Sequence, residues 1–248
     1  MINIVIPMAG LGSRFEKEGY EDPKPLIKVH GVPMIKLVID NLRPSQDHRF
    51  IFICQKEHVL EYGLSEKLSQ WAPESEIISI NGLTEGAACT VLKARDYIGF
   101  DDHLMVANCD QFVDISIDTY LSVLSQNELD GLIMTMTADD PKWSFARIND
   151  ENLVTEVAEK EVISNEATVG IYNFKRGGDF LYGADEMINQ NFRVNNEFYV
   201  APIYNYLIAR KNKIGIYNIG SEFDGMYGLG IPSDLEKFLK IQRFSNTS

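Results

Sequence analysis

The chain has 248 residues, in which 23 Lys and Arg stand against 36 Asp and Glu, so its formal net charge is −13. No stretch gathers Lys or Arg into a stripe, and a field of this sign repels nucleic acid and anionic membranes, so we expect neither as a partner. A globule of this length buries roughly 70–75% of its unfolded surface, which allows a full hydrophobic core. Because Lys and Arg are outnumbered and not clustered, a Lys or Arg held in a defined position is a candidate contact for an anionic ligand.

Short apolar runs alternate with segments of helical period up to about residue 110, which is typical of a largely parallel sheet covered by helices. The predicted strands here are residues 2–6, 49–55, 75–81 and 103–110. The predicted helices between them are residues 34–42, 58–71 and 86–98. This alternation predicts an α/β fold.

After residue 130 the pattern changes, because several strands follow one another. The predicted strands are residues 130–138, 145–148, 153–160, 167–174 and 213–219. The predicted helices are residues 180–190, 198–211 and 232–242. Asn-Asp-Glu-Asn joins the second strand of this set to the third as hairpin material, so we expect a mixed sheet. No linker interrupts the chain, and we predict one domain over residues 1–248.

Cysteine usage and the N-terminus bear on the cellular compartment. Cys54, Cys89 and Cys109 stand far apart without a C-x-x-C pair, and an odd count argues against a disulfide framework. The chain reaches Pro7 after a short apolar run with no charged region before it, so we expect neither a signal peptide nor a membrane span. Both observations fit a cytoplasmic protein.

The first loop combines flexible backbone with fixed positive charge. In “MAGLGSRF”, Gly10 and Gly12 allow positive φ, and successive N–H groups can form an anion-binding concavity beyond the strand end. Arg14 can form paired hydrogen bonds with phosphate oxygens. In “DPKPLIKV”, prolines on both sides hold Lys24 extended, so its ammonium stays aimed. An ordinary glycine turn and a solvated lysine are the structural alternatives.

These two segments, with “GVPMI” after them, resemble the signature loop of the sugar-phosphate nucleotidylyltransferases, the nucleoside-diphosphate-sugar pyrophosphorylases of the GT-A-like α/β fold. “NGLTEGAACTVLKA” resembles the family's base-recognition segment, “VANCDQ” its metal aspartate, and “VTEVAEKEVISNEATVGIYNF” its Glu-Lys element. The tail “GLGIPSDLEKFL” resembles its closing Asp-Ile-Gly-Thr-Pro motif. “WSFARI” and “NEFYVAPIYN” are similar to the branch associated with bacterial capsule and surface-polysaccharide gene clusters.

The resemblance covers residues 4 to about 239 and implies a single-domain, three-layer α/β/α fold with a mostly parallel mixed sheet. Residues 1–130 would bind the nucleotide, and residues 131–248 the phosphorylated acceptor. Such an enzyme joins a nucleoside triphosphate to a phosphorylated metabolite, with a sugar 1-phosphate as the leading acceptor, and releases pyrophosphate. The acceptor phosphate is already ionised near neutral pH, so cations and aligned dipoles can lower the barrier without a general base.

The same resemblance implies a role for each candidate residue. Arg14, Lys24 and Lys160 are the catalytic cations, and Asp110 holds Mg²⁺, the expected cofactor. The predicted nucleotide-binding residues are Met8, Ala9, Gly10, Leu11, Gly12, Thr84, Glu85, Gly86 and Asn108. The predicted acceptor-binding residues are Glu159, Lys160, Gly170 and Glu197.

One position departs from the family motif, because Gly228 stands where the second metal carboxylate is usual. The nearest acid is Asp224. We expect either that Asp224 replaces the missing carboxylate or that Asp110 binds the metal with water and phosphate alone.

Other functions fit part of this pattern. A CTP-dependent cytidylyltransferase acting on a small non-sugar phosphate, such as phosphocholine, would use the same site. A GT-A glycosyltransferase shares the fold and a strand-end metal acid but has no need of Arg14 and Lys24. The missing acid at Gly228 also fits a non-catalytic nucleotide or sugar-phosphate sensor. The residues leave the base, the acceptor and the oligomeric state open, with a homo-oligomer as the common default.

Overall fold

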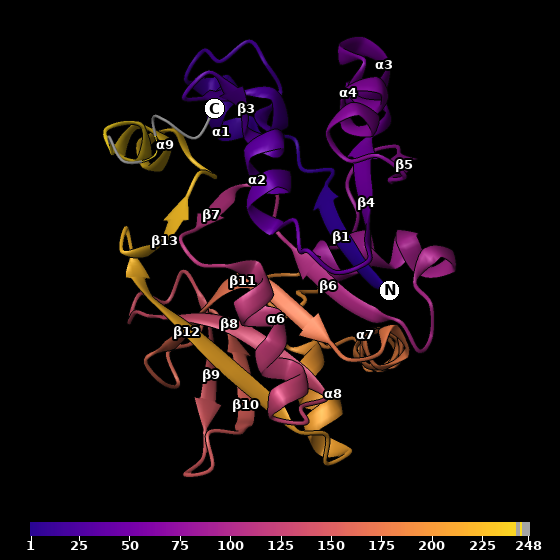
Figure 1. The fold of residues 1–248 in the computed structure, drawn as a ribbon, viewed down its shortest axis with the longest axis vertical. Helices are drawn as coiled ribbons and strands as arrows, with labels where there is room; N and C mark the ends of the chain where they lie inside the picture. Colours follow the sequence, from indigo (N-terminus) through magenta and orange to yellow (C-terminus); the bar gives the residue numbers. More distant parts are fainter. Residues whose placement is uncertain (242–243, 245–248) are drawn as a thin grey trace.

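The computed structural model describes residues 1–241 and 244, and Figure 1 shows how their elements are arranged. The strands are β1 (Ile2–Met8), β2 (Lys28–Val29), β3 (Val32–Pro33), β4 (His48–Gln55), β5 (Glu76–Ile80), β6 (His103–Ala107), β7 (Gln111–Val113), β8 (Gly131–Thr137), β9 (Ser144–Ile148), β10 (Val154–Glu159), β11 (Glu166–Phe174), β12 (Ile214–Glu222) and β13 (Gly225–Gly228). The helices are α1 (Ser13–Lys17), α2 (Met34–Leu42), α3 (Lys56–Tyr62), α4 (Leu64–Trp71), α5 (Ala87–Val91), α6 (Ile117–Gln126), α7 (Gly177–Asn189), α8 (Ile203–Ala209) and α9 (Pro232–Leu239), with 3-10 helices η1 (Lys24–Leu26) and η2 (Leu92–Tyr97).

An 11-stranded mixed sheet forms the centre of the molecule, in the order β5-β4-β1-β6-β11-β8-β12-β13-β7, with the β9-β10 hairpin attached to β11. β1 is parallel to β4 and β6, and β8 is parallel to β12. β11 runs antiparallel to its neighbours β6 and β8. The prediction of a mixed sheet is therefore confirmed.

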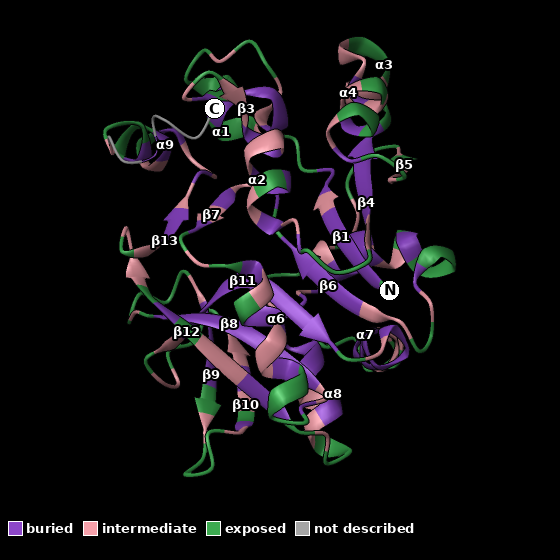
Figure 2. Cartoon of the chain, viewed as in Figure 1, coloured by how far each residue is buried: buried purple, intermediate pink, exposed green. Residues whose placement is uncertain are grey.

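Helices cover both faces of this sheet, so the fold has three layers. Along β1, Ile4 and Ile6 contribute to one apolar core while Val5 contributes to the other, as the two-residue period of a strand requires. The first core also takes side chains from α2, α4 and α6, and the second takes side chains from α5, α7 and α8. Figure 2 shows that strands β1 and β4 are largely buried and that the outer sides of several helices are exposed. The predicted α/β/α architecture is confirmed.

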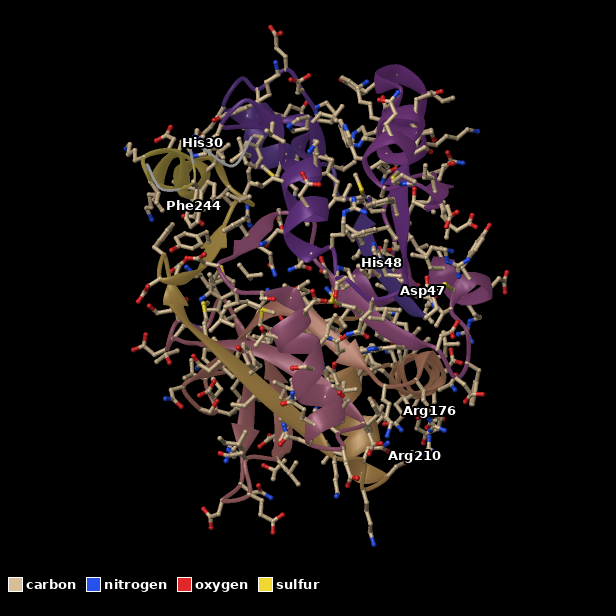
Figure 3. The ribbon with its side chains drawn as sticks, in the orientation of Figure 1. His30, Asp47, His48, Arg176, Arg210 and Phe244 are labelled. Atoms are coloured by element: carbon tan, nitrogen blue, oxygen red, sulfur yellow. The ribbon has the colours of Figure 1, made fainter. Side chains whose placement is uncertain are left out.

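A third apolar cluster ties the C-terminal helix to the N-terminal part of the chain. Phe15 of α1, Tyr227 of β13 and Phe238 of α9 are all buried in it. His30 and Phe244 lie beside α9 in Figure 3 and line the same small hollow. The stacked and edge-to-face rings of this cluster hold α9 against β13 and near α1, which places both helices close to the loop after β1.

Local backbone and tertiary contacts change three predicted helices. Residues 58–71 form two helices, because Gly63 takes φ 57° between α3 and α4. Residues 86–98 form a short α-helix that continues as a 3-10 helix. In residues 198–211 the helix begins only at Ile203. The last residue of the predicted helix 232–242 lies outside the described residues. Of the helices in the described chain, none combines the length and apolar character that spanning a bilayer requires.

Gly63→Ala tests the break between α3 and α4. A side chain at φ 57° is strained in the left-handed region, so we expect the free energy of unfolding to fall by about 1–2 kcal/mol in urea titrations. Gly63→Asn should lose less, because Asn tolerates this region. Ser69→Ala, at an exposed position of α4, is the control and should stay within about 0.5 kcal/mol of wild type. A Gly63→Ala variant as stable as wild type contradicts the explanation.

Candidate active site

Two glycines shape the loop between β1 and α1. Gly12 takes φ 67°, and a Cβ there would stand 3.1 Å from Lys24 Cβ, so a side chain would be both strained and crowded. A Cβ at Gly10 would meet nothing within 4 Å, so Gly10 borders open space. Gln55 Nε2, at the end of β4, donates a buried hydrogen bond to the Ala9 carbonyl at 2.5 Å. The loop is thus anchored to the sheet while its glycines leave room for a ligand.

Lys24 and Asp110 meet at the centre of this region. Lys24 Nζ donates a hydrogen bond to Asp110 Oδ2 at 2.7 Å, and the side chains are only 18% and 24% exposed. Burial lowers the pKa of Lys24, but the charge and hydrogen bond of Asp110 outweigh it, so the net pKa lies above its ordinary value. Lys24 is therefore a fixed cation at neutral pH, and it comes from a segment flanked by Pro23 and Pro25.

A cleft opens beside this pair. Its larger cavity, of about 570 Å³, is lined by Arg14, Asp110 and Lys160, so charged groups from three distant parts of the chain face one space. That volume lies within the ordinary range for small-molecule sites, about 300–1,000 Å³. A second cavity of about 270 Å³ adjoins it. The residues that line both cavities are Asn108, Lys142, Trp143 and Lys160.

Glu159 ends β10 and Lys160 follows it at the wall of this cleft. The Glu159 side chain is only 5% exposed and accepts a hydrogen bond from the Ser144 hydroxyl. Lys160 takes φ 57°, and its backbone N–H donates to the Trp143 carbonyl at 3.0 Å. Lys160 Nζ lies 3.6 Å from Glu159 Oε1 and 4.8 Å from the centre of the Tyr199 ring. Burial lowers the pKa of Lys160, but Tyr199 and Glu159 raise it above its ordinary value, which keeps a cation at this wall.

Gly170 and Asn108 are in close contact across the cleft floor. Gly170 takes φ 81°, and a Cβ there would stand 2.1 Å from Asn108 Nδ2. The Gly170 carbonyl accepts a backbone hydrogen bond from Asn108 at 3.0 Å. Only glycine fits this position, and its presence interrupts the pairing register of β11 between Thr168 and Tyr172.

The predicted base segment packs against the loop that precedes α8. The Glu85 carbonyl accepts a backbone hydrogen bond from Phe198 at 2.8 Å. Gly86 takes φ 127°, and a Cβ there would stand 2.5 Å from the Phe198 carbonyl oxygen. Thr84 and Glu85 line a separate hollow of about 610 Å³ rather than either cavity of the cleft. The structure therefore places these two residues at a different opening from Asp110.

Several predicted site residues line neither cavity of the cleft: Met8, Ala9, Gly10, Leu11, Gly12, Lys24, Thr84, Glu85, Gly86, Glu197 and Asp224. Of these, Leu11, Gly12 and Lys24 line a separate hollow of about 280 Å³, although Lys24 is hydrogen-bonded to Asp110. Met8 is buried in the core, only 2% exposed, and Leu11 is exposed at 57%. Asp224 is exposed in the turn between β12 and β13, where its backbone N–H donates to the Ser221 carbonyl. Glu197 is also exposed.

Sequence reasoning missed Lys142, Ser144 and Asp234, all of which face the cleft. Lys142 stands in Asp-Pro-Lys-Trp, where a proline precedes the lysine as it does at Lys24. Asp234 lies in the first turn of α9, which a sequence reader assigns to helix capping. A lysine next to a proline could therefore have been recognised from the sequence as a candidate site residue, whereas Asp234 could not.

A family profile described as nucleotidyl transferase matches residues 4–192. The chain therefore belongs to the nucleotidyl transferase family and is an enzyme of that class. Among curated proteins it is similar to the bifunctional protein GlmU of Methanocaldococcus jannaschii, with 24% identity over 178 residues covering 71% of this chain and 40% of that protein. The GlmU of Aquifex aeolicus is 25% identical over 230 residues, covering 83% and 46%. The chain thus spans less than half the length of these two relatives.

Solved structures share the whole fold. A nucleoside-diphosphate-sugar pyrophosphorylase from Vibrio cholerae RC9 superposes with a TM-score of 0.81 at 27% identity, over 96% of this chain and 99% of that one. A UDP-glucose pyrophosphorylase complexed with UDP-glucose gives 0.77 at 16%, over 98% and 99%. The inositol-1-phosphate CTP transferase from T. maritima gives 0.73 at 14%, over 96% of each chain. The predicted fold class is confirmed.

Glu159→Gln tests the burial of the acid at the cleft wall. Burial raises the pKa of Glu159, and the Ser144 and Lys160 contacts oppose this only in part. A carboxyl group whose pKa is raised by folding stabilises the protein at low pH, and this stability is lost as pH rises through the folded pKa. Gln does not titrate, so the stability of Glu159→Gln relative to wild type should rise from about pH 4 upward and then level off.

Thermal melts between about pH 4 and pH 7 measure this difference. Glu161→Gln, on the exposed turn that follows, controls for the loss of one negative charge. A relative stability that stays flat or falls across the range contradicts the explanation.

Proposed function

We propose that the protein joins a nucleoside triphosphate to a phosphorylated small molecule, with a sugar 1-phosphate as the first candidate, and releases pyrophosphate. The observation that carries the proposal is the hydrogen-bonded pair of Lys24 and Asp110 at a cleft that Arg14 and Lys160 also line. In this proposal residues 1–130 hold the nucleotide and residues 131–248 hold the acceptor. The pyrophosphorylase of Vibrio cholerae with the same fold supports the reaction class.

The proposed step needs no general base. An oxygen of the acceptor phosphate attacks the α-phosphorus, a new P–O bond forms, and the bond from the α-phosphorus to the oxygen bridging to the β-phosphorus breaks. Pyrophosphate leaves with that oxygen. Lys24 and Arg14 neutralise the crowded triphosphate, while Lys160 orients the acceptor phosphate from the opposite wall. The glycine loop admits the triphosphate close to the backbone, with Gly10 at its open side.

The donor set at the cleft fits a hard divalent cation. Mg²⁺ in phosphate-transfer sites takes one or two carboxylates and completes its shell with phosphate oxygens and water. Asp110 is a carboxylate on the cavity wall and would hold Mg²⁺ there, where the cation supplies charge neutralisation to the phosphates. Asp224, the other acid that the sequence predicts as a ligand, is exposed in its turn.

A second candidate acceptor is a small phosphate that bears an amine, such as phosphocholine activated with CTP. Two aromatic faces at the cleft already lie against ammonium groups, since Lys142 Nζ lies 4.9 Å from the Trp143 ring centre and Lys160 Nζ 4.8 Å from that of Tyr199. Aromatic faces attract such cations. The T. maritima protein with this fold is a CTP transferase for inositol 1-phosphate, so the fold accommodates CTP.

The biological setting is proposed on the resemblance of residues 143–148 and 196–205 alone. We place the reaction in the cytoplasm and in capsule or surface-polysaccharide synthesis. We also propose that the enzyme works as a homo-oligomer.

Incubation of the protein with each of CTP, UTP, dTTP and GTP, Mg²⁺ and a panel of phosphorylated sugars and amines tests the function. Pyrophosphate release with one pair supports the proposal and names the base and acceptor. Release of a nucleoside diphosphate from a nucleotide sugar would instead indicate a glycosyltransferase. Binding of an NTP without turnover of any acceptor would indicate a sensor, and either of these two results overturns the proposal.

Lys24→Met and Lys160→Met separate the two halves of the site. Removing one group that stabilises transition-state charge typically costs 10²–10³ in kcat, so we expect a loss of about that size for Lys24→Met. Lys160→Met should raise the KM for the acceptor by about tenfold or more while changing the KM for the NTP little. Steady-state kinetics with both substrates varied give these constants.

Lys28→Met, an exposed lysine from the same segment as Lys24, is the matched control and should keep wild-type constants. A Lys160→Met variant whose NTP KM rises while its acceptor KM is unchanged contradicts the assignment of the acceptor wall.

A further inference from the structure

We propose that Asp234, in the first turn of α9, is the second carboxylate of the metal site and takes the role that the sequence assigned to Asp224. This proposal rests on the proposed function, because it concerns the metal that would accompany the triphosphate. It assigns a ligand to a residue of the C-terminal tail for which the sequence predicted no role in metal binding.

The cleft brings Asp234 to the same space as Asp110. Both residues line the larger cavity. A Cβ at Gly230 would stand 2.6 Å from Asp110 Oδ2, and a Cβ at Gly228 would stand 3.6 Å from Asp234 Oδ2. The strip from Gly228 to Gly230 therefore has one carboxylate near each end. Since both ends are glycine, no side chain of theirs fills the space beside the two acids.

The backbone around the strip is fixed. Gly228 pairs with Gln111 where β13 runs antiparallel to β7, and Leu229 donates a backbone hydrogen bond to the Asp110 carbonyl at 2.8 Å. α9 packs on β13, as Figure 1 shows for the C-terminal part of the chain. Asp234 is thus held over the strip by packing, although it follows Gly228 by six residues.

The two oxygens of Asp234 have different surroundings. Oδ1 lies 3.5 Å from Lys237 Nζ on the same helix, and the Asp234 side chain is 19% exposed. Oδ2 is the oxygen nearest to Gly228. One oxygen is therefore balanced by a lysine, while the other lies near Gly228, which also lines the cavity.

A separate observation points to a ligand at this place. Gln111 is only 7% exposed and lines the same cavity as Asp110 and Asp234. Its Nε2 is buried and has no hydrogen-bond partner among the described residues. A buried amide donor without a partner costs about 1–3 kcal/mol, and a ligand oxygen that reached this amide from the cavity that Gln111 lines would remove that cost.

The donor set suits Mg²⁺ bound together with phosphate. Within residues 1–241 and 244, no three His, Cys, Asp or Glu side chains gather as ligands. Two carboxylates with phosphate oxygens and water match the coordination that Mg²⁺ takes in phosphate-transfer enzymes. The competing explanation is that Asp234 serves only the helix, where an acid in the first turn contributes about 0.3–1 kcal/mol.

Metal affinity separates the two explanations. Mn²⁺ is titrated into the protein, and its binding is measured by electron paramagnetic resonance. The protein is saturated in separate experiments with the α,β-methylene analogue of CTP, UTP, dTTP or GTP, in which the scissile bond cannot break. We expect Asp234→Asn to weaken Mn²⁺ binding by about tenfold or more, since even indirect partners of a metal site cost 10–100-fold. Asp224→Asn, which changes an exposed turn, is the matched control and should stay within about twofold of wild type.

A relocated carboxylate provides the second readout. A Cβ at Gly228 would meet no atom nearer than Asp234 Oδ2, and Gly228 lies outside the left-handed region, so the position accepts a side chain. Gly228→Asp combined with Asp234→Asn should therefore recover Mn²⁺ binding to within about threefold of wild type, because the carboxylate returns to the same space. A purely helical role of Asp234 predicts no such recovery.

Asp234→Ser keeps a polar side chain at this position of the helix and serves if Asp234→Asn melts early. Mn²⁺ affinity within about twofold of wild type in either folded variant overturns the proposal, as does a loss confined to Asp224→Asn. The readout needs neither acceptor nor turnover. If Asp234→Asn loses Mn²⁺ binding but no pair of NTP and acceptor gives pyrophosphate, only the proposed function is wrong. If a pair gives pyrophosphate but Asp234→Asn binds Mn²⁺ as wild type does, only this inference is wrong.

Discussion

The ammonium of Lys24 and the carboxylate of Asp110 meet 2.7 Å apart at the ends of β1 and β6, and the rest of the site is arranged around that contact. β1 and β6 pair in parallel, so the loops that follow them begin at the same edge of the sheet. The close approach of Gly12 to Lys24 and the flanking prolines fix where the ammonium stands. Breaking such a pair by removing one partner leaves an uncompensated charge, which costs about 3–5 kcal/mol for a fully buried pair and less for this partly exposed one. The triphosphate of an NTP is a second anion with which the Lys24 ammonium can form hydrogen bonds.

Much of the fold could be predicted because several of its strands appear in the sequence as runs of apolar residues. Apolar runs predicted β1, β4 and β6, since buried parallel strands read as continuous hydrophobic segments. The run of β11 was recognised too, because that strand is buried although it is antiparallel to its neighbours. β7 and β13 gave no local signal, because strands of three or four residues depend on pairing with other strands: β7 pairs with β13 across more than a hundred positions, and β13 also pairs with β12. Helix α6 was missed although Ser116 caps it and Tyr120, Leu121 and Leu124 follow a helical period. In residues 198–202, a backbone contact with Glu85 outweighs the helical pattern.

The structure brings together several residues that the motifs at strand ends predicted, whereas it separates residues that were grouped by their nearness in the sequence. The motifs predicted Arg14, Lys24, Asp110 and Lys160 at one site. In the structure Arg14, Asp110 and Lys160 line one cavity, and Lys24 is hydrogen-bonded to Asp110. Asp224 is nearer to Gly228 along the chain than Asp234 is, yet α9 folds back and brings the later acid to the cavity. Nearness in sequence was therefore a poor guide to which carboxylate lines the cavity.

The central claim is that the Lys24–Asp110 pair marks the triphosphate site. A crystal structure with the α,β-methylene analogue of the NTP that the enzyme accepts tests it most directly. We expect the triphosphate to lie against Gly10 to Gly12, with Lys24 Nζ within hydrogen-bond distance of a phosphate oxygen. A triphosphate bound in the hollow beside Thr84 and Glu85, with Lys24 still paired only to Asp110, would contradict it.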